Sequence, residues 1–223
     1  MAPKSKPSSR APKKRDATRE RLLSRALALF QRKGVEGTTM RDIAKAAKLS
    51  LGAAYYYFPS KEALVFAYYE DNQEAYEALA AELTGTTREQ LGALFHGKLD
   101  TIRAQRKMLA AIVQRLVDPG DPLSAFSAQT RAVRDRALGV LERVLAGAAV
   151  PSDVVPLAAR ALWLLQMAMM LVFVNDDSDD QKRTHGLVDD ALDMIVPMLP
   201  LLGTPMGKAI ADKVTAALAK AGI

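Results

Sequence analysis

The sequence contains no cysteine, so disulfide bonds and metal or redox sites built on thiolates are excluded. Only two histidines occur, His96 and His185, and they lie far apart in the chain. Glycine-rich phosphate-binding loops and the G-x-S-x-G and H-E-x-x-H motifs are also missing. The acidic segment 175–181, NDDSDDQ, lacks the glycine and the distal glutamate of a calcium-binding loop. We therefore expect no catalytic residues, no metal, no cofactor and no enzyme.

Long hydrophobic runs and alternating strand patterns are absent as well. The longest apolar stretch, residues 161–174, is interrupted by Gln166 and is shorter than the roughly 20 residues that a membrane-spanning helix needs. Residues 1–15 contain no apolar segment of the kind found in signal peptides. Together these absences predict an all-α protein of the cytoplasm that has no membrane contact.

Acidic residues are missing from one end of the chain. Residues 1–15 carry six Lys/Arg and no acid, residues 16–61 carry nine against four acids, and residues 62–223 carry sixteen against twenty-one. A basic front end on an acidic body suggests that the first sixty residues meet a polyanion and the rest does not. The alternative for the tail alone is a solubilising segment.

Hydrophobic residues recur at helical spacing through most of the chain. They predict a helix from Asp16 that ends at Gly34, short helices over 39–47 and 50–58, and a longer helix over 61–83. Later helices are expected over 123–146, 153–175, 180–199 and 205–221, among others. We therefore expect a disordered basic tail (1–15), a three-helix domain (16–61) and a larger helical domain (62–223).

Three short helices with a tight turn between the second and third are typical of a helix-turn-helix DNA-binding domain. The third helix would enter the major groove, and Leu51, Gly52 and Ala53 keep its outer face slim enough to approach base edges. Tyr55 and Tyr56 suit the same surface, because a phenol can donate a hydrogen bond to a phosphate.

The segment TTMRDIAKAAKLSLGAAYYYFPSKEALV (38–65) resembles the N-terminal domain of the TetR/AcrR family of bacterial transcriptional regulators. The shared pattern is Thr-Thr, Ile-Ala, a small-residue turn, Tyr-Tyr-x-Phe, and Lys-Glu-x-Leu at the start of the fourth helix. The resemblance extends over about residues 16–65. It implies a homodimeric repressor that binds a double-stranded, palindromic operator and is released by a small-molecule inducer.

The resemblance also implies particular DNA contacts. Residues at the positions of Thr39, Tyr55, Tyr56 and Lys61 would touch phosphates, while Arg41 and the start of the third helix would face bases. The whole predicted DNA-binding surface is Thr39, Arg41, Lys48, Ser50, Leu51, Gly52, Ala53, Tyr55, Tyr56 and Lys61.

Aromatic and methionine side chains recur at helical spacing in the larger domain, and such residues are core by default. A ligand pocket would draw on the same residues, because methionine adapts to varied apolar shapes. Gln166 stands alone in an apolar helix and needs a polar partner: a ligand, a neighbouring helix or a dimer mate. The predicted pocket residues are Phe66, Tyr69, Phe95, Met108, Phe126, Trp163, Gln166, Met167 and Met170.

The helix over 153–175 is apolar nearly all round, so none of its sides suits water. The helix after it offers a stripe of Leu187, Ala191 and Ile195. Two such helices from each of two chains would form a four-helix dimer interface. The alternative is that both are core elements of a monomer, enclosed by the helix over 205–221.

Three functions are compatible with these features. The first is a repressor released from its operator by a small, largely apolar ligand. The second is a DNA-binding dimer of the same fold that is controlled by a protein partner or lacks an inducer. The third, a helical enzyme tethered to DNA, has no catalytic residues to support it. An enclosed pocket beside the fourth helix would favour the first function, and a filled core the second.

Overall fold

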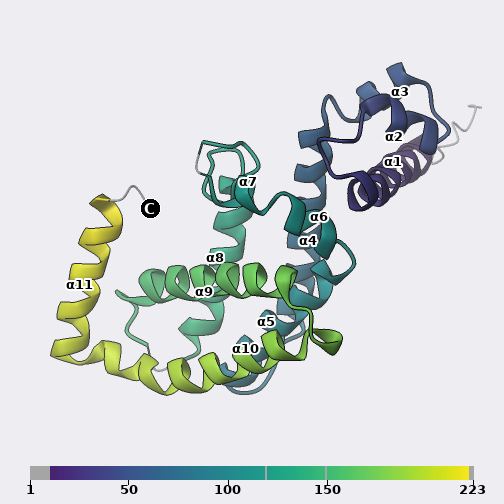
Figure 1. The fold of residues 1–223 in the computed structure, drawn as a ribbon. Helices are drawn as coiled ribbons and strands as arrows, with labels where there is room; N and C mark the ends of the chain where they lie inside the picture. Colours follow the sequence, from purple (N-terminus) through teal and green to yellow (C-terminus); the bar gives the residue numbers. More distant parts are fainter. Residues whose placement is uncertain (1–10, 119, 149, 221–223) are drawn as a thin grey trace, which may run out of the picture. The chain divides into compact units, whose positions relative to one another are not determined.

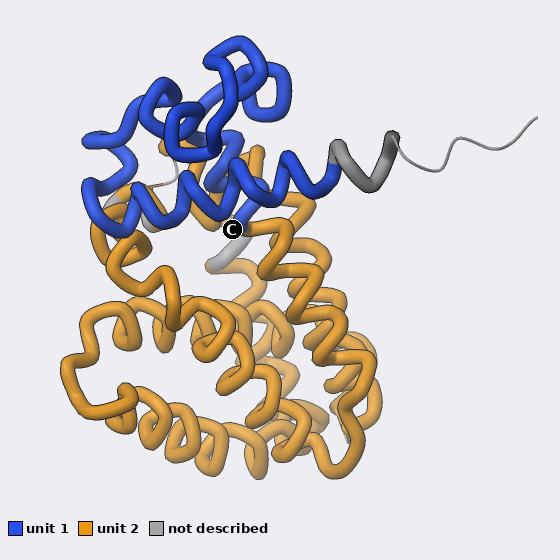
Figure 2. The backbone as a smooth tube through the Cα atoms, turned by 90° about the vertical axis from the view of Figure 1, so that its right-hand side faces the viewer, with its two compact units in different colours: residues 1–68 blue, residues 69–223 orange. Residues whose placement is uncertain are grey.

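The computed structural model describes residues 11–118, 120–148 and 150–220, and it divides into two compact units, residues 1–68 and 69–223 (Figure 2). Over the described residues all regular structure is helical, which confirms the predicted all-α class (Figure 1). The boundary between the units falls inside helix α4 (Lys61–Ala81), so this helix begins in the first unit and ends in the second. The sequence places the boundary between the domains near residue 61, at the start of the same helix.

The first unit contains α1 (Ala11–Lys33), α2 (Met40–Ala46), α3 (Leu51–Tyr57) and the first residues of α4. Its core is formed by apolar side chains from all of these helices. They include Leu22, Leu23, Ala26, Phe30, Val35, Ile43, Ala54, Phe58, Leu64 and Val65. Gly34 ends α1 as predicted, since its φ of 73° is a left-handed conformation that favours glycine.

Helix α1 begins at Ala11, five residues earlier than predicted. Proline is tolerated in the first turn of a helix, because the N–H that it lacks would have no partner inside the helix. Alanine, lysine and arginine, which fill most of residues 11–15, are all strong helix formers. Part of the predicted tail is therefore helical, and residues 1–10 lie outside the described residues.

The second unit is a bundle of helices packed around α9 (Val155–Asn175), which contacts α5, α6, α8 and α10 (Figure 1). These are α5 (Thr87–Arg103), α6 (Arg106–Ala111), α8 (Arg131–Ala146) and α10 (Lys182–Ile195). The remaining elements are α7 (Val113–Val117), the 3₁₀ segments η1 (Asp179–Gln181) and η2 (Val196–Gly203), and α11 (Pro205–Lys220), which packs on η2.

The helix predicted over 123–146 is wrong in its first third, because α8 begins only at Arg131. Hydroxyl groups explain the difference. Ser124 Oγ donates to Leu116 O (3.1 Å), Ser127 Oγ donates to Pro122 O (2.9 Å), and Thr130 Oγ1 donates to Ser124 O (2.6 Å). Side chains that bond to nearby carbonyls in this way compete with helix formation.

Helix α9 is long and apolar enough to cross a membrane, a criterion that the core helix of a soluble protein also meets. Leu162, Gln166 and Phe173 are buried inside the second unit. The side chain of Gln166 donates a long hydrogen bond (3.4 Å) to the phenol oxygen of Tyr76 on α4. The neighbouring helix is therefore a polar partner of this glutamine, one of the three that the sequence left open.

Candidate nucleic-acid interface

Helix α2 begins with a capping box. Thr39 Oγ1 accepts a hydrogen bond from Asp42 N (3.1 Å), and the Asp42 carboxylate accepts from Thr39 N (3.1 Å) and from Thr39 Oγ1 (2.8 Å). The side-chain and backbone bonds from Thr39 lower the pKa of Asp42 below its usual value. The box stabilises the first turn of α2, and Arg41 lies in this turn.

The turn between α2 and α3 depends on a left-handed residue. Lys48 has a φ of 56°, and Leu49 N donates to Ala44 O (2.9 Å) across the end of α2. Ser50 then caps α3 by accepting a hydrogen bond from Ala53 N (3.1 Å). This short connection gives the tight turn that a helix-turn-helix unit requires.

Helix α3 has two different faces. Ala54 and Phe58 are buried in the first unit, while Tyr55 and Tyr56 are 48% and 69% exposed. A side chain added at Gly52 would meet no other atom within 4 Å, so the outer face of the helix is open at this position. The helix therefore presents a thin surface with two phenols at its C-terminal end, which suits entry into a groove.

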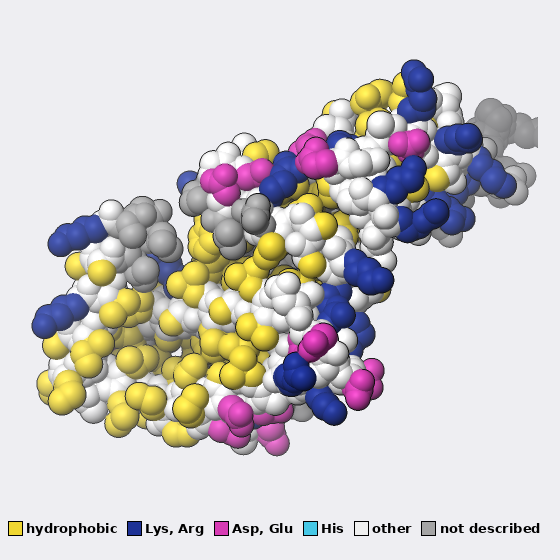
Figure 3. Space-filling view, viewed as in Figure 1, with side chains coloured by type: hydrophobic (Ala, Val, Ile, Leu, Met, Phe, Trp, Pro, Cys, Tyr) yellow, Lys and Arg dark blue, Asp and Glu magenta, His cyan; other side chains and the backbone are white. Residues whose placement is uncertain are grey.

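The exposed side of α2 is basic. Arg41 and Lys45 are four residues apart on this helix, and both are exposed, as is Lys48 in the turn. Sequence reasoning missed Lys45. Its spacing from Arg41 was the available signal, because residues at i and i+4 share a helix face. Figure 3 shows Lys and Arg side chains (dark blue) on the surface of the first unit.

Lys61 has an internal role in addition to the predicted phosphate contact. Its ammonium group donates to Val35 O (2.8 Å) and lies 3.8 Å from the Glu36 carboxylate, and its side chain is 22% exposed. Lys61 thus ties the first residues of α4 to the loop after α1. An ammonium has three protons, so this bond leaves donors for a phosphate.

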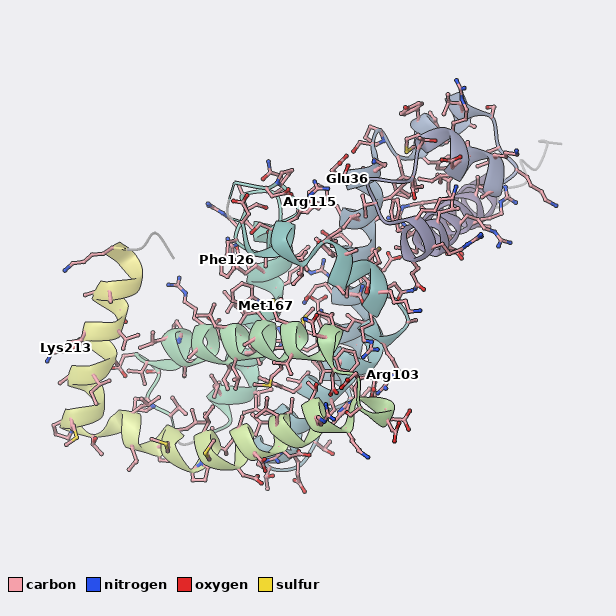
Figure 4. The ribbon with its side chains drawn as sticks, viewed as in Figure 1. Glu36, Arg103, Arg115, Phe126, Met167 and Lys213 are labelled. Carbon is pink, nitrogen blue, oxygen red and sulfur yellow. The ribbon has the colours of Figure 1, made fainter. Side chains whose placement is uncertain are left out.

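The predicted pocket residues divide between the two units. Phe66 belongs to the first unit and the other eight belong to the second. Phe95, Met108, Trp163 and Gln166 are buried, whereas Tyr69, Phe126, Met167 and Met170 are partly exposed. Phe126, which is labelled in Figure 4, meets Trp163 edge to face with ring centroids 5.6 Å apart.

Two cavities in the second unit lie elsewhere. One of about 500 Å³ is lined by residues from the start of α5, the end of α8 and η2, including Gln90, Arg143 and Leu199. The other, of about 430 Å³, lies beside the end of α9 and the start of α10 and includes Val172 and Arg183. None of the nine predicted pocket residues lines either cavity.

Unpacked apolar side chains follow α9, α10 and the segments after them, and hydrophobic residues (yellow) gather on this unit in Figure 3. The large ones are Val172, Leu187, Met194, Met198, Leu201, Met206, Ile210 and Val214. Of the predicted interface residues on α10, Leu187 is exposed, whereas Ala191 is buried within its own chain. Ile195 is partly exposed. The exposed face of α10 thus runs from Leu187 to Met194, whereas Ala191 packs inward beside Val188 and Leu192.

Comparison with known proteins identifies the first unit. Residues 22–68 match the family described as "Bacterial regulatory proteins, tetR family". The probable HTH-type transcriptional regulator YttP of Bacillus subtilis is 36% identical over 80 residues, which make up 34% of this chain and 39% of YttP. IcaR of Staphylococcus aureus, a negative transcriptional regulator of the biofilm operon icaADBC, is 37% identical over 46 residues, or 21% of this chain and 25% of IcaR. The chain thus spans well under half the length of these relatives.

Solved structures extend the likeness to the second unit. The crystal structure of a putative TetR-family transcriptional regulator from Syntrophomonas wolfei aligns with a TM-score of 0.67 and covers 82% of this chain and 96% of that one. The sequence identity is 18%, so this match concerns the fold alone. Residues 22–68 are therefore similar to the DNA-binding domain of the tetR family, and over most of its length the chain shares the fold of the solved TetR-family structure.

Proposed function

We propose that this protein is a cytoplasmic transcriptional repressor that binds a palindromic operator as a homodimer and leaves it when a small, largely apolar ligand binds the second unit. The observation that carries the proposal is the surface of α2 and α3. It combines the exposed basic side chains of Arg41 and Lys45 with a slim helix that ends in exposed Tyr55 and Tyr56. Arginine reads guanine edges, and phenols and lysines hold phosphates.

Repression is proposed by analogy with IcaR, which is described as a negative regulator. The two proteins are similar over 46 residues, and likeness over so short a segment does not determine whether transcription falls or rises. The palindromic operator follows from the homodimer, because a two-fold axis presents two identical DNA-binding units to the DNA.

Helix α4 is the proposed connection between ligand and DNA. It is continuous from Lys61 to Tyr76. Lys61 donates a hydrogen bond to Val35 O in the first unit, and Tyr76 accepts one from Gln166 in the second. A ligand that moves the second half of α4 therefore acts on a helix whose first turn is bonded to the DNA-binding unit. A switch from mostly bound to mostly free requires about 10⁴-fold differential affinity, near 5.5 kcal/mol.

The second candidate is a regulator of the same fold that responds to a protein partner or to no inducer. One observation favours it: the two cavities described above are lined by none of the predicted pocket residues, and four of those residues are buried. A core that is already filled would leave no room for an inducer.

Selection of bound fragments from genomic DNA by the purified protein tests the function. We expect enrichment of a sequence with two inverted half-sites, protected by wild-type protein and released by at least one apolar compound from a small-molecule panel. Enrichment without release by any compound would support the second candidate. No enrichment above the level of an Arg41→Ala, Lys45→Ala variant would contradict both.

A further inference from the structure

One lysine of α5, Lys98, is only partly exposed to solvent. Leu91, Leu94 and Ile102 are buried on one face of this helix, and Lys98 lies four residues from both Leu94 and Ile102 on the same face. Its ammonium group is positioned over the ring of Tyr76 on α4, 5.2 Å from the ring centroid. Burial lowers the pKa of Lys98 to about 8, and no charged neighbour contributes to this shift.

The surrounding polar groups are neutral and come from two other helices. Tyr76 on α4 is buried, and its phenol oxygen accepts from Gln166 Nε2 on α9 (3.4 Å). Gln73, one turn before Tyr76, is also buried. Its amide nitrogen donates to Glu77 (3.1 Å), but its Oε1 receives no hydrogen bond from the described residues. The interior thus holds a cation that forms no ion pair with a described carboxylate, and an acceptor without a donor.

Such an arrangement is costly for a protein that binds nothing there. A charge without a counter-ion loses its hydration and gains only the attraction of a ring face. Structural lysines in cores are normally paired, whereas a desolvated and unpaired titratable group is typical of a functional site. Glu77, which follows Tyr76 on α4, binds Arg136 (2.7 and 2.8 Å).

We propose that the interior between α4, α5 and α9 binds an organic carboxylate with an apolar body, and that Lys98 is the counter-ion of its head group. This inference rests on the proposed ligand-responsive function and gives the chemical class of the ligand. The Gln166 amide, which bonds to Tyr76 over a long distance, is the second donor for the head group. Phe95 and Trp163, buried on the same helices, supply the apolar surroundings. The ligand would meet α4 at Tyr76, in the part of that helix that lies in the second unit.

Trp163 makes the inference testable, because it is the only tryptophan in the chain and lies one turn before Gln166. The fluorescence emission of Trp163 measures the binding of octanoate and of 1-octanol. The measurement is made on wild type and on the variants Lys98→Met, Lys98→Arg and Lys107→Met. Lys107 is an exposed lysine of α6 and serves as the matched control. We expect wild type and Lys107→Met to bind octanoate at least tenfold more tightly than octanol. Lys98→Arg should keep this preference and Lys98→Met should lose it.

The pH dependence separates a counter-ion from a merely structural lysine. Octanoate affinity of wild type should fall by up to tenfold per pH unit above about 8, while Lys98→Arg should not change up to pH 9.5, because arginine stays charged. Tyr76 does not titrate in this range, because burial raises its pKa to about 12. Glu77 is already ionised, because its pKa is lowered to about 2. The single charged side chain of α9, Arg160, is exposed. Equal affinity for the two probes, or no emission change with either, would overturn the carboxylate site. The genomic DNA selection tests the regulator independently of these probes.

Discussion

The Nδ1 atoms of His96 on α5 and His185 on α10 lie 2.7 Å apart, and the two imidazole rings are stacked with centroids 5.0 Å apart. Arg103 Nη2, which can only donate, lies 3.2 Å from His185 Nε2, so that nitrogen accepts. His185 Nδ1–H then donates to His96 Nδ1, and His96 Nε2–H donates to Asp189 (3.0 Å). All four ring nitrogens are satisfied when both rings are neutral.

An added proton breaks this chain, so the contact between α5 and α10 should weaken in acid. The pKa of His185 is lowered from 6.5 by burial, then by the charge of His96, with Arg103 acting in the same direction and Asp100 and Asp189 against it. Because the folded pKa lies below the unfolded one, the unfolded state takes up the proton first. The free energy of unfolding should therefore fall as pH drops below 6.5, until the folded pKa is reached.

Thermal unfolding midpoints between pH 8 and pH 5 test this expectation. His185→Phe removes the titrating ring and should lose less stability over that range than wild type does. The lowered pKa of Asp189 and of Glu77, about 2 for the latter, affects stability only below about pH 4.5 and does not interfere. Parallel curves for the two proteins would show that the histidine pair is not the source of the acid sensitivity.

Lys98→Met should stabilise the free protein at neutral pH. The folded pKa of about 8 lies below the usual 10.5, so the buried charge destabilises the folded state at pH 7. Methionine has a similar length and no charge, and we expect a gain of roughly 1–3 kcal/mol in the free energy of unfolding. The gain should shrink by pH 10, where the wild-type lysine is largely neutral in the folded protein. Urea unfolding at pH 7 and pH 10, with Lys107→Met as control, measures both values. A loss of stability at both pH values would contradict the assignment of an unpaired charge.

Arg41→Ala should reduce specific binding more than non-specific binding. A bidentate contact to a guanine edge contributes about 1–3 kcal/mol of discrimination, and Arg41 is exposed next to the capped start of α2. Tyr55→Phe should instead weaken binding to all sequences, because it removes a phosphate donor. Both variants are titrated against the selected operator and against unrelated DNA of equal length. Equal losses on the two DNAs for Arg41→Ala would make Arg41 a phosphate contact.

Local signals in the sequence were reliable for this protein. The predicted end of α1 at Gly34 and the two short helices predicted after it, now α2 and α3, are all present in the structure. Each of these features depends on residues within a few positions of one another, so the sequence pattern contains the necessary information.

Features that depend on long-range packing could not be predicted in the same way. Ala191 and Leu187 belong to one amphipathic helix, and the packing of α10 against α5, α9 and η2 decides which of its apolar residues are buried. Lys98 was missed because a lysine in an amphipathic helix normally lies on its exposed side. Its spacing from Leu94 and Ile102 was the available signal.

Removal of residues 2–10 should flatten the salt dependence of DNA binding. This segment contains Lys4, Lys6 and Arg10 and no acid. Each phosphate that a basic side chain neutralises contributes about 0.9 to the slope of log affinity against log salt, so the slope should fall by up to about 3. Binding to unrelated DNA between 50 and 300 mM salt measures it. An unchanged slope would show that the segment stays away from the DNA and serves solubility.

A charge at the exposed apolar surface of α9 and α10 should dissociate the dimer. Val172 and Leu187 are each 42% exposed, and Met194 is 66% exposed, so their packing within one chain is incomplete. In a two-fold interface each substitution appears twice, and unpaired buried carboxylates are strongly unfavourable. We expect Val172→Asp or Leu187→Asp to weaken the dimer at least hundredfold, about 3 kcal/mol, and to remain folded as a monomer.

Ala191→Asp should behave differently, because Ala191 is buried in its own chain and a charge there should unfold the second unit. Light scattering gives the mass and circular dichroism the helix content, with Lys107→Asp as an exposed control. A monomeric wild type at micromolar concentration, or a Leu187→Asp dimer that binds its operator normally, would place the interface elsewhere.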